Sequence, residues 1–298
     1  MTSKKFLVVG DLHITEDTPK NRIDNYNEAL KNKLIYIFSY ARKYNCCILQ
    51  PGDFFDKPNP SYRFFSEIVS LFKTYDDVMV LAIYGQHDMK YRQKENTALG
   101  ALESSCGNLR ILSGEKIYSL DEYIIYGSGY GESIPKIKIR NTKSILLIHK
   151  MVVKDKLWTQ QTDFVYVKDL LKENEFDIIV SGDNHTSFSD TVGKKILFNC
   201  GSLMRSTVAQ IEHKPVMYML DGKVCEKIHI PVKDFVFDER KIEIEKKRNL
   251  ELDAFVKGLS EHKEMGLNFE DNLLFYFKKN NVDKEIQEFI KRCLRDLP

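Results

Sequence analysis

The sequence lacks features that mark several large classes of protein. Its six cysteines form no Cys-x-x-Cys pair, so they suit a reduced, cytosolic protein better than a disulfide framework or a structural zinc site. No apolar run approaches the ~18 residues of a membrane-spanning helix. The first residues, Met1–Lys5, lead into a predicted strand without a signal-peptide pattern. We therefore expect a cytoplasmic protein that has no membrane segment.

An excess of charge of one sign is also missing. The net charge is +2, although 30% of the 298 residues are charged. A protein without a global basic field can bind nucleic acid only through a local cluster of basic side chains. The length suits one large α/β domain followed by a small second part.

The first part of the chain predicts a parallel β-sheet with crossover helices. Apolar runs at 6–9, 46–50 and 78–83 predict buried strands. Between them, the spacing of apolar residues predicts helices over 25–43 and from the N-cap Ser61 to residue 75. Strands that alternate with helices in this way are typical of a parallel sheet.

Short strands dominate the middle of the chain. They are predicted at 111–112, 117–118, 123–126, 144–148 and 177–180, with short helices at 98–104 and 167–172. Three further runs, 195–198, 216–220 and 224–230, predict a closing antiparallel meander. Pro231 follows and marks a boundary, so we expect a first domain over 1–232 and a mostly helical appendage over 233–298.

The predicted appendage carries two apolar stripes with helical spacing. One stripe consists of Leu252, Phe255, Val256 and Leu259, and the other of Ile286, Phe289, Ile290 and Cys293. Such a stripe can pack on the first domain or bind a partner, because both uses need the same spacing of apolar residues.

Five predicted strands end in clusters of carboxylate, imidazole and amide side chains. The clusters are Asp11-Leu12-His13, Gly52-Asp53, Gly85-Gln86-His87-Asp88, His149 and Gly182-Asp183-Asn184-His185. The carboxyl ends of parallel strands meet at one edge of a sheet, so we expect these side chains to converge on one cleft. Imidazole and carboxylate together suit divalent transition metals. The two oxygens of Asp53 would let it bridge a pair of metals, which can activate a water and clamp a phosphate.

Each of these residues alone has a simpler explanation. A single aspartate after a strand is often a helix cap or a turn residue, and His149 could be a half-buried histidine with an ordinary partner. The combination of clusters at five strand ends favours a metal site.

In this order the clusters resemble the signature of the calcineurin-like metallophosphoesterases, which is D-x-H, G-D, G-N-H-D, a lone His and G-H-x-H. The resemblance covers about residues 6–220 and implies an α/β fold, a two-sheet α/β/β/α sandwich with a di-metal site. Within the superfamily, the chain is similar to the SbcD-type nucleases of bacteria and phages. The stretch Gly52–Ser61, the segment Asn199–Ser206 and the helical tail carry this second similarity.

The resemblance implies a role for each matching residue. Metal one would be held by Asp11, His13, Asp53 and His185, and metal two by Asp53, Gln86, His149 and Asp183. The catalytic pair would be His87, which faces the scissile phosphate, and Asp88, which holds the ring of His87. Arg205 is a candidate for binding the phosphate of the substrate, although a salt-bridged surface arginine is an equally simple reading.

Two positions depart from the family pattern, and both belong to metal two. The family has Asn where Gln86 stands and His where Asp183 stands. These changes leave His149 as the single nitrogen ligand, and oxygen ligands favour Mn²⁺ or Mg²⁺ over Zn²⁺. Two interpretations stay open: an active enzyme tuned to Mn²⁺, and an enzyme whose second metal is bound weakly.

The resemblance implies a Mn²⁺-dependent DNA nuclease, a 3′-to-5′ exonuclease with single-strand endonuclease activity. Such a nuclease would act in DNA repair and recombination with an SbcC-like ABC-type ATPase, and it could form a homodimer. One alternative is a phosphoesterase for a small molecule or a phosphoprotein, and another is a catalytically weak scaffold of the same fold. An open groove would favour the nuclease, and a deep closed pocket would favour the small-molecule enzyme.

Overall fold

The computed structural model describes residues 5–91, 93–94, 96–139, 142–156, 162–222, 224–234, 236–238, 247, 250 and 269–295. They fall into two compact units, Met1–Phe237 and Asp238–Pro298. The division lies after the boundary predicted at residue 232, because the chain that follows Pro231 still pairs with the first unit. The Ile23 amide donates to the Val236 carbonyl at 3.0 Å, and Arg22 forms a β-bridge with Phe237.

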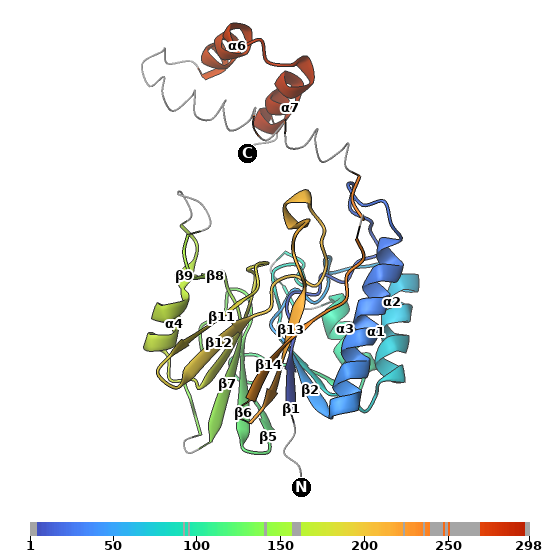
Figure 1. Ribbon diagram of the computed structural model, residues 1–298, viewed down its shortest axis with the longest axis vertical. Helices are drawn as coiled ribbons and strands as arrows, with labels where there is room; N and C mark the ends of the chain where they lie inside the picture. Colours follow the sequence, from blue (N-terminus) through green and yellow to red (C-terminus); the bar gives the residue numbers. More distant parts are fainter. Residues whose placement is uncertain are drawn as a thin grey trace. The chain divides into compact units, whose positions relative to one another are not determined.

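The first unit contains a six-stranded sheet with the order β14-β13-β1-β2-β3-β4. Its strands are β1 (Lys5–Val8), β2 (Cys46–Gln50), β3 (Val80–Ala82), β4 (Leu109–Ile111), β13 (Val216–Asp221) and β14 (Val224–His229). The strands β1 to β4 are mutually parallel, and β13 and β14 join antiparallel at one side. One face of this sheet is covered by the helices α1 (Tyr26–Tyr44), α2 (Tyr62–Thr74) and α3 (Ala98–Ser105), as Figure 1 shows.

A second six-stranded sheet has the order β11-β12-β10-β7-β6-β5. Its strands are β5 (Tyr118–Leu120), β6 (Tyr123–Ser128), β7 (Lys143–His149), β10 (Ile178–Gly182), β11 (Phe188–Val192) and β12 (Lys195–Asn199). The helix α4 (Val167–Glu173) lies on its outer side, next to a small sheet of β8 (Val152–Val153) and β9 (Val165–Tyr166). A short 3₁₀ helix, Val208–Gln210, follows in the connection from β12 to β13.

The predicted closing meander is confirmed for β13 and β14, which pair antiparallel, and wrong for its first strand. The strand β12 belongs to the second sheet, where it pairs with β10 and β11, whereas β13 and β14 belong to the first. The connection from Cys200 to Pro215 carries the chain from one sheet to the other. The strand β11 was not predicted, because its polar residues Ser189, Asp190 and Thr191 hide the strand pattern.

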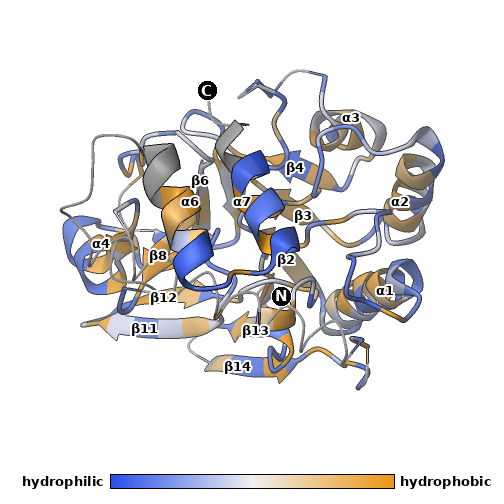
Figure 2. Cartoon of the chain, turned by 90° about the horizontal axis from the view of Figure 1, so that it is seen from above, coloured by the Kyte–Doolittle hydropathy of each residue, from blue (hydrophilic) through white to orange (hydrophobic). Residues whose placement is uncertain are grey.

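Alternation of side chains along each strand divides the interior of the first unit into layers. In β2, Ile48 packs toward the helices, and Leu49 packs in the layer between the two sheets. In β7, Leu147 belongs to the layer between the sheets, and Leu146 packs with Leu171 of α4. Figure 2 shows α1, α2 and α3 beside one sheet and α4 beside the other. The predicted α/β/β/α sandwich is therefore confirmed.

The second unit contains α6 (Phe269–Lys279) and α7 (Lys284–Arg295). Its small core joins Leu273 and Phe277 of α6 with Ile290 of α7. Part of the stripe predicted on α7 therefore packs inside this unit. The other predicted stripe, Leu252 to Leu259, lies outside the described residues. Within the described part of the chain, no helix is long and apolar enough to cross a membrane.

Asn108 holds the end of α2 against the first sheet. Its side-chain amide donates to the carbonyls of Phe72 at 3.3 Å, Tyr75 at 2.9 Å and Val78 at 3.1 Å. The residue is only 5% exposed, so water cannot replace these bonds.

We expect Asn108→Ala to lower the free energy of unfolding by ~2 kcal/mol, because it removes the side-chain hydrogen bonds to three carbonyls at a buried position. Urea denaturation of the full-length protein measures this change. The exposed loop residue Asn59 provides a control, since Asn59→Ala should change the free energy by less than ~0.5 kcal/mol. Equal effects of the two substitutions would contradict the role given to Asn108.

Candidate metal centre

The polar clusters at the strand ends converge where the two sheets meet. Asp11, Asp53 and Gln86 follow β1, β2 and β3 of the first sheet, and His149 and Asp183 come from the ends of β7 and β10 of the second. The ligands therefore come from two sheets, and not from the edge of one sheet as predicted. A hydrogen bond from the Asp183 amide to Asp11 Oδ2, 3.0 Å long, joins the two sets of loops.

The residues expected to hold metal one lie together. Asp11, His13 and His185 each offer one ligand atom, and these atoms lie within 4.8 Å of one another. His13 Nε2 and His185 Nε2 are 3.1 Å apart, and His185 Nε2 lies 3.7 Å from Asp11 Oδ2. Two imidazole nitrogens and a carboxylate oxygen thus point at one small volume, as the ligands of a transition metal do.

Asp53 lies between the two expected metal positions. Its Oδ2 is 3.7 Å from His13 Nε2 and 3.5 Å from His149 Nε2. Its Oδ1 accepts a hydrogen bond from the His87 amide at 2.9 Å. The expected bridge would use both oxygens of Asp53. In the structure Oδ2 alone faces both histidines, because Oδ1 is engaged with the backbone.

The residues expected to hold metal two form a continuous chain of contacts. His149 Nδ1 donates to the Pro51 carbonyl at 2.7 Å, so its Nε2 is directed at Gln86 Oε1, 2.9 Å away. The amide nitrogen of Gln86 donates to Asp183 Oδ1 at 2.9 Å. Oxygen acceptors of Gln86 and Asp53 therefore surround His149 Nε2, and only a cation, either a proton or a metal, satisfies that arrangement.

Two buried carboxylate oxygens support the same conclusion. Among the described residues, Asp11 Oδ1 and Asp53 Oδ2 are buried side-chain atoms without a hydrogen-bond partner. A buried carboxylate oxygen without a partner is costly, so a native protein rarely leaves one unless a ligand binds there. The donor set thus fits two divalent cations.

The electrostatics of the centre follow from burial and from the mixture of acids and imidazoles. Burial raises the pKa of Asp11 to about 7. Burial opposes ionisation of Asp53 too, but the nearby rings of His149 and His13 lower its pKa to about 2. Burial disfavours the charged ring of His149, yet Asp53 and Asp11 raise its pKa to about 9. A proton on His149 thus supplies part of the positive charge that the carboxylates require.

His87 faces the cleft, with 43% of its side chain exposed. Its Nδ1 donates to the backbone carbonyl of Asp56 at 3.0 Å, which leaves Nε2 as the nitrogen available to a substrate. The Asp56 carboxylate lies 3.4 Å from His13 Nδ1 and 3.8 Å from His87 Nδ1. Asp56, the second acid of the Gly52–Ser61 stretch, was not among the predicted site residues.

The role predicted for Asp88 is wrong. Asp88 is 1% exposed and does not hold the ring of His87. Its carboxylate accepts hydrogen bonds from the amides of Phe54 at 3.1 Å, Phe55 at 2.8 Å and Gly85 at 2.9 Å. Asp88 therefore fixes the backbone that carries the metal ligands and does not meet the substrate.

Arg205 is also placed differently from the prediction. It is 8% exposed, and its guanidinium donates to the carbonyls of Ile211 and Lys233. It does not line the hollows beside the metal centre. The predicted contact with the phosphate of the substrate is therefore wrong, and Arg205 binds backbone instead.

Glycines leave space for the ligands of neighbouring loops. A Cβ atom on Gly52 would lie 2.4 Å from His149 Nδ1, and one on Gly182 would lie 2.5 Å from Asp11 Oδ1. Each distance is far below a van der Waals contact. The Gly-Asp pairs of the sequence are therefore explained by packing, because each glycine makes room for a ligand from another strand.

The sandwich fold and this set of ligands define a metal-dependent hydrolase. Residues 4–187 match the family model of the calcineurin-like phosphoesterases, and the chain belongs to this family. No curated protein matches the chain. One crystal structure is similar over 76% of this chain and 99% of its own, with 13% identity and a TM-score of 0.47. A novel archaeal phosphodiesterase is similar over the same shares, with 14% identity and a TM-score of 0.41.

We expect Asp53→Asn to weaken the binding of both divalent cations, because one oxygen of Asp53 faces both sets of ligands. Calorimetric titration with Mn²⁺ should show two bound ions for the wild type and a loss of at least about tenfold in affinity for the variant. Asp190→Asn, on β11, is the matched control and should leave both sites intact. Unchanged titration of Asp53→Asn would contradict the assignment of the bridge.

Proposed function

We propose that the protein is a DNA nuclease that hydrolyses phosphodiester bonds, as a 3′-to-5′ exonuclease with single-strand endonuclease activity. Membership of the phosphoesterase family supports the reaction type. The similarity to SbcD-type nucleases supports the choice of DNA, of repair and recombination as the process, and of an SbcC-like ATPase as the partner.

The observation that carries the proposal is the shape of the surface around the metal centre. One hollow of about 470 Å³ is lined by His13, His87 and His185. Another, of about 810 Å³, is lined by His149 and Asp183. Neither is an enclosed cavity, and together they flank the metal ligands. Open space on both sides of a phosphate suits a polymer strand, whereas a small-molecule site surrounds most of its ligand.

The chemistry follows from the residues around the phosphate. Two divalent cations bound here would neutralise the phosphoryl oxygens and lower the pKa of a coordinated water. His87 lines the hollow of about 470 Å³, and its Nδ1 is held by a hydrogen bond to the Asp56 carbonyl. When its ring is doubly protonated, Nε2–H can donate to the phosphoryl group and can protonate the departing sugar oxygen. Asp88 keeps the loops of Asp53 and Gly85 in position through their backbone amides.

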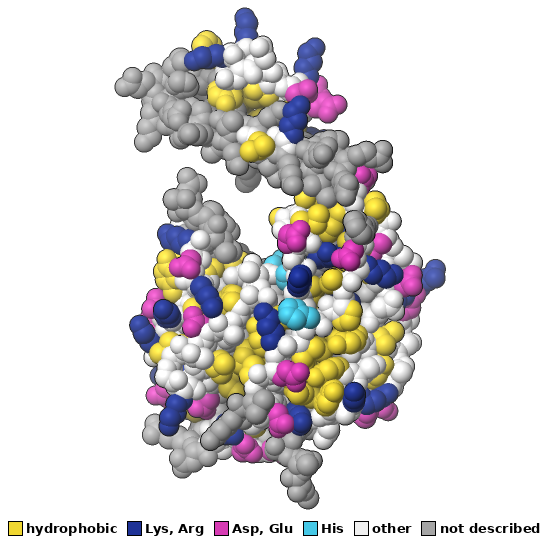
Figure 3. All heavy atoms as spheres, in the orientation of Figure 1, with side chains coloured by type: hydrophobic (Ala, Val, Ile, Leu, Met, Phe, Trp, Pro, Cys, Tyr) yellow, Lys and Arg dark blue, Asp and Glu magenta, His cyan; other side chains and the backbone are white. Residues whose placement is uncertain are grey.

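The distribution of charge is compatible with contacts to a few phosphates. Figure 3 shows lysine and arginine side chains scattered among acidic ones on the face in view. Lys150 lines the larger hollow, next to the ligand His149. Phosphate contacts orient a nucleic acid without requiring a basic field over the whole protein.

The second unit is the proposed site for the ATPase partner. On α6, Leu274 and Phe275 are 48% and 52% exposed, while Leu273 and Phe277 form the small core. Exposed apolar side chains on a helix of this kind can insert into the groove of a partner. Formation of a homodimer stays a prediction.

Hydrolysis of end-labelled duplex and single-stranded DNA with Mn²⁺ tests the proposed function. We expect His87→Ala to lower the rate by about 10²- to 10⁴-fold, the usual contribution of a general acid. His229→Ala, which removes an exposed histidine of β14, should retain the wild-type rate. Hydrolysis of bis-p-nitrophenyl phosphate without cleavage of DNA would replace the nuclease by a phosphoesterase for another substrate. Inactivity toward both, with the ATPase partner present, would favour the scaffold.

The choice of metal gives a second test. Oxygen atoms of Gln86 and Asp53 face His149 Nε2, and Asp183 adds a carboxylate that contacts the Gln86 amide. We therefore propose Mn²⁺ as the metal that supports activity, with Mg²⁺ as a weaker substitute. Wild-type activity with Mn²⁺ should exceed that with Zn²⁺. Asp183→His adds a nitrogen ligand and should raise the ratio of Zn²⁺ to Mn²⁺ activity. Equal or greater activity of the wild type with Zn²⁺ would contradict this account of the ligand shell.

A further inference from the structure

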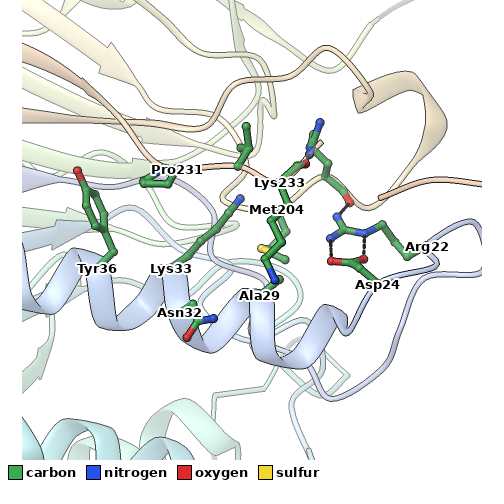
Figure 4. A pocket seen from close by; sticks show the side chains of 11 residues that line it. Arg22, Asp24, Ala29, Asn32, Lys33, Tyr36, Met204, Pro231 and Lys233 are labelled. Carbon is green, nitrogen blue, oxygen red and sulfur yellow. Dashed lines mark hydrogen bonds and ion pairs between the residues drawn. The ribbon is translucent and has the colours of Figure 1, made fainter. Parts of the chain in front are cut away.

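A separate cavity of about 210 Å³ lies beside α1, behind the loop that follows β12. Figure 4 shows residues that line it from four parts of the first unit: the segment around Arg22, the helix α1 with Lys33, the loop after β12 with Met204, and the segment after β14 with Lys233. Met204 lines this cavity and also the hollow beside the metal centre. The metal ligands themselves do not line it.

Three buried cations surround this cavity. Arg22 is 8% exposed, Lys33 9% and Arg205 8%. Asp24 is the acidic residue of the lining, and both of its oxygens are bound to Arg22 at 2.7 Å. The lining therefore carries more positive than negative charge, on side chains that are each less than a tenth exposed.

Lys33 is the cation with the fewest described partners. Its ammonium donates to the Leu203 carbonyl at 2.8 Å, although an ammonium group has three N–H donors. Burial, followed by the charges of Arg205 and Arg22, lowers the pKa of Lys33 to about 7. Figure 4 shows its side chain extending from α1 into the cavity. Lys33 thus lacks an anionic partner among the described residues that line the cavity.

The two arginines bind neighbouring backbone, but these bonds do not balance their charge. Arg22 donates to the Arg205 carbonyl at 2.7 Å, and Arg205 donates to the carbonyls of Ile211 and Lys233. Burial and the charge of Arg22 lower the pKa of Arg205. Asp234 and Glu212 act in the opposite direction, each more weakly than Arg22. Asp24 forms an ion pair with Arg22 and also opposes the lowered pKa of Arg205 and Lys33, but this one acid of the lining cannot balance all three cations.

We propose that this cavity binds a small phosphate-bearing anion, either inorganic phosphate or the phosphate group of a mononucleotide. A dianion placed among Arg22, Lys33 and Arg205 would accept charge-assisted hydrogen bonds from their remaining N–H groups. The cavity volume of about 210 Å³ is far above the space that one water needs, which leaves room for a tetrahedral anion. The proposal concerns a site apart from the metal centre and does not depend on the nature of the substrate.

Calorimetric titration of the full-length protein with sodium phosphate tests this proposal. A chelator removes binding that depends on metal, and chloride keeps the ionic strength constant. We expect Lys33→Gln, which keeps a neutral donor for the Leu203 carbonyl, to weaken phosphate binding by about tenfold or more. Lys31→Gln is the matched control, because Lys31 lies on the same helix and pairs with Glu67 outside the cavity. It should bind phosphate as the wild type does.

Parallel titrations with a 5′-mononucleotide and with its nucleoside distinguish the two sources of the phosphate group. Tighter binding of the mononucleotide than of inorganic phosphate would identify a nucleotide site, and the reverse would identify a phosphate site. The nucleoside should not bind in either case. Lys33→Met, which also removes the buried charge, repeats the test if Lys33→Gln does not fold. The proposal is overturned if the wild type binds neither anion at millimolar concentration. It is also overturned if every Lys33 variant that folds binds the anion as tightly as the wild type does.

Discussion

The burial of two carboxylates, Asp11 and Asp53, at the junction of two sheets is the constraint on which the site depends. Each is 1% exposed, and a buried carboxylate must be neutralised by a proton or by nearby positive charge. His149 and His13 provide part of that charge in the protein alone, and divalent cations would provide the rest. The same requirement explains why ligands from both sheets have to meet at one point.

Much of the site could be predicted because its signals are local. Short apolar runs ending in Gly-Asp identified the strand ends that carry Asp53 and Asp183. Helix signals were equally direct: Ser61, the predicted N-cap of α2, accepts a hydrogen bond from the Phe64 amide. Such patterns depend on a few neighbouring residues, so they can be read without knowledge of the tertiary structure.

The features that could not be predicted depend on partners distant in the sequence. The assignment of β12 and β13 to different sheets follows from packing across the interior, and their hydrophobic patterns are alike. The carboxylate of Asp88 accepts hydrogen bonds from amides of another loop. Arg205 donates to carbonyls that no local sequence pattern identifies as acceptors. Asp56 was missed for a related reason, because its carboxylate lies beside two histidines that follow other strands.

The division of the metal ligands between the two sheets has a consequence during synthesis of the chain. The strands that carry Asp11 and Asp53 leave the ribosome first, and β10, which precedes Asp183 and His185, follows much later. Before that point the nascent chain possesses only part of either ligand set. A centre with all of its ligands therefore cannot form until translation has passed His185.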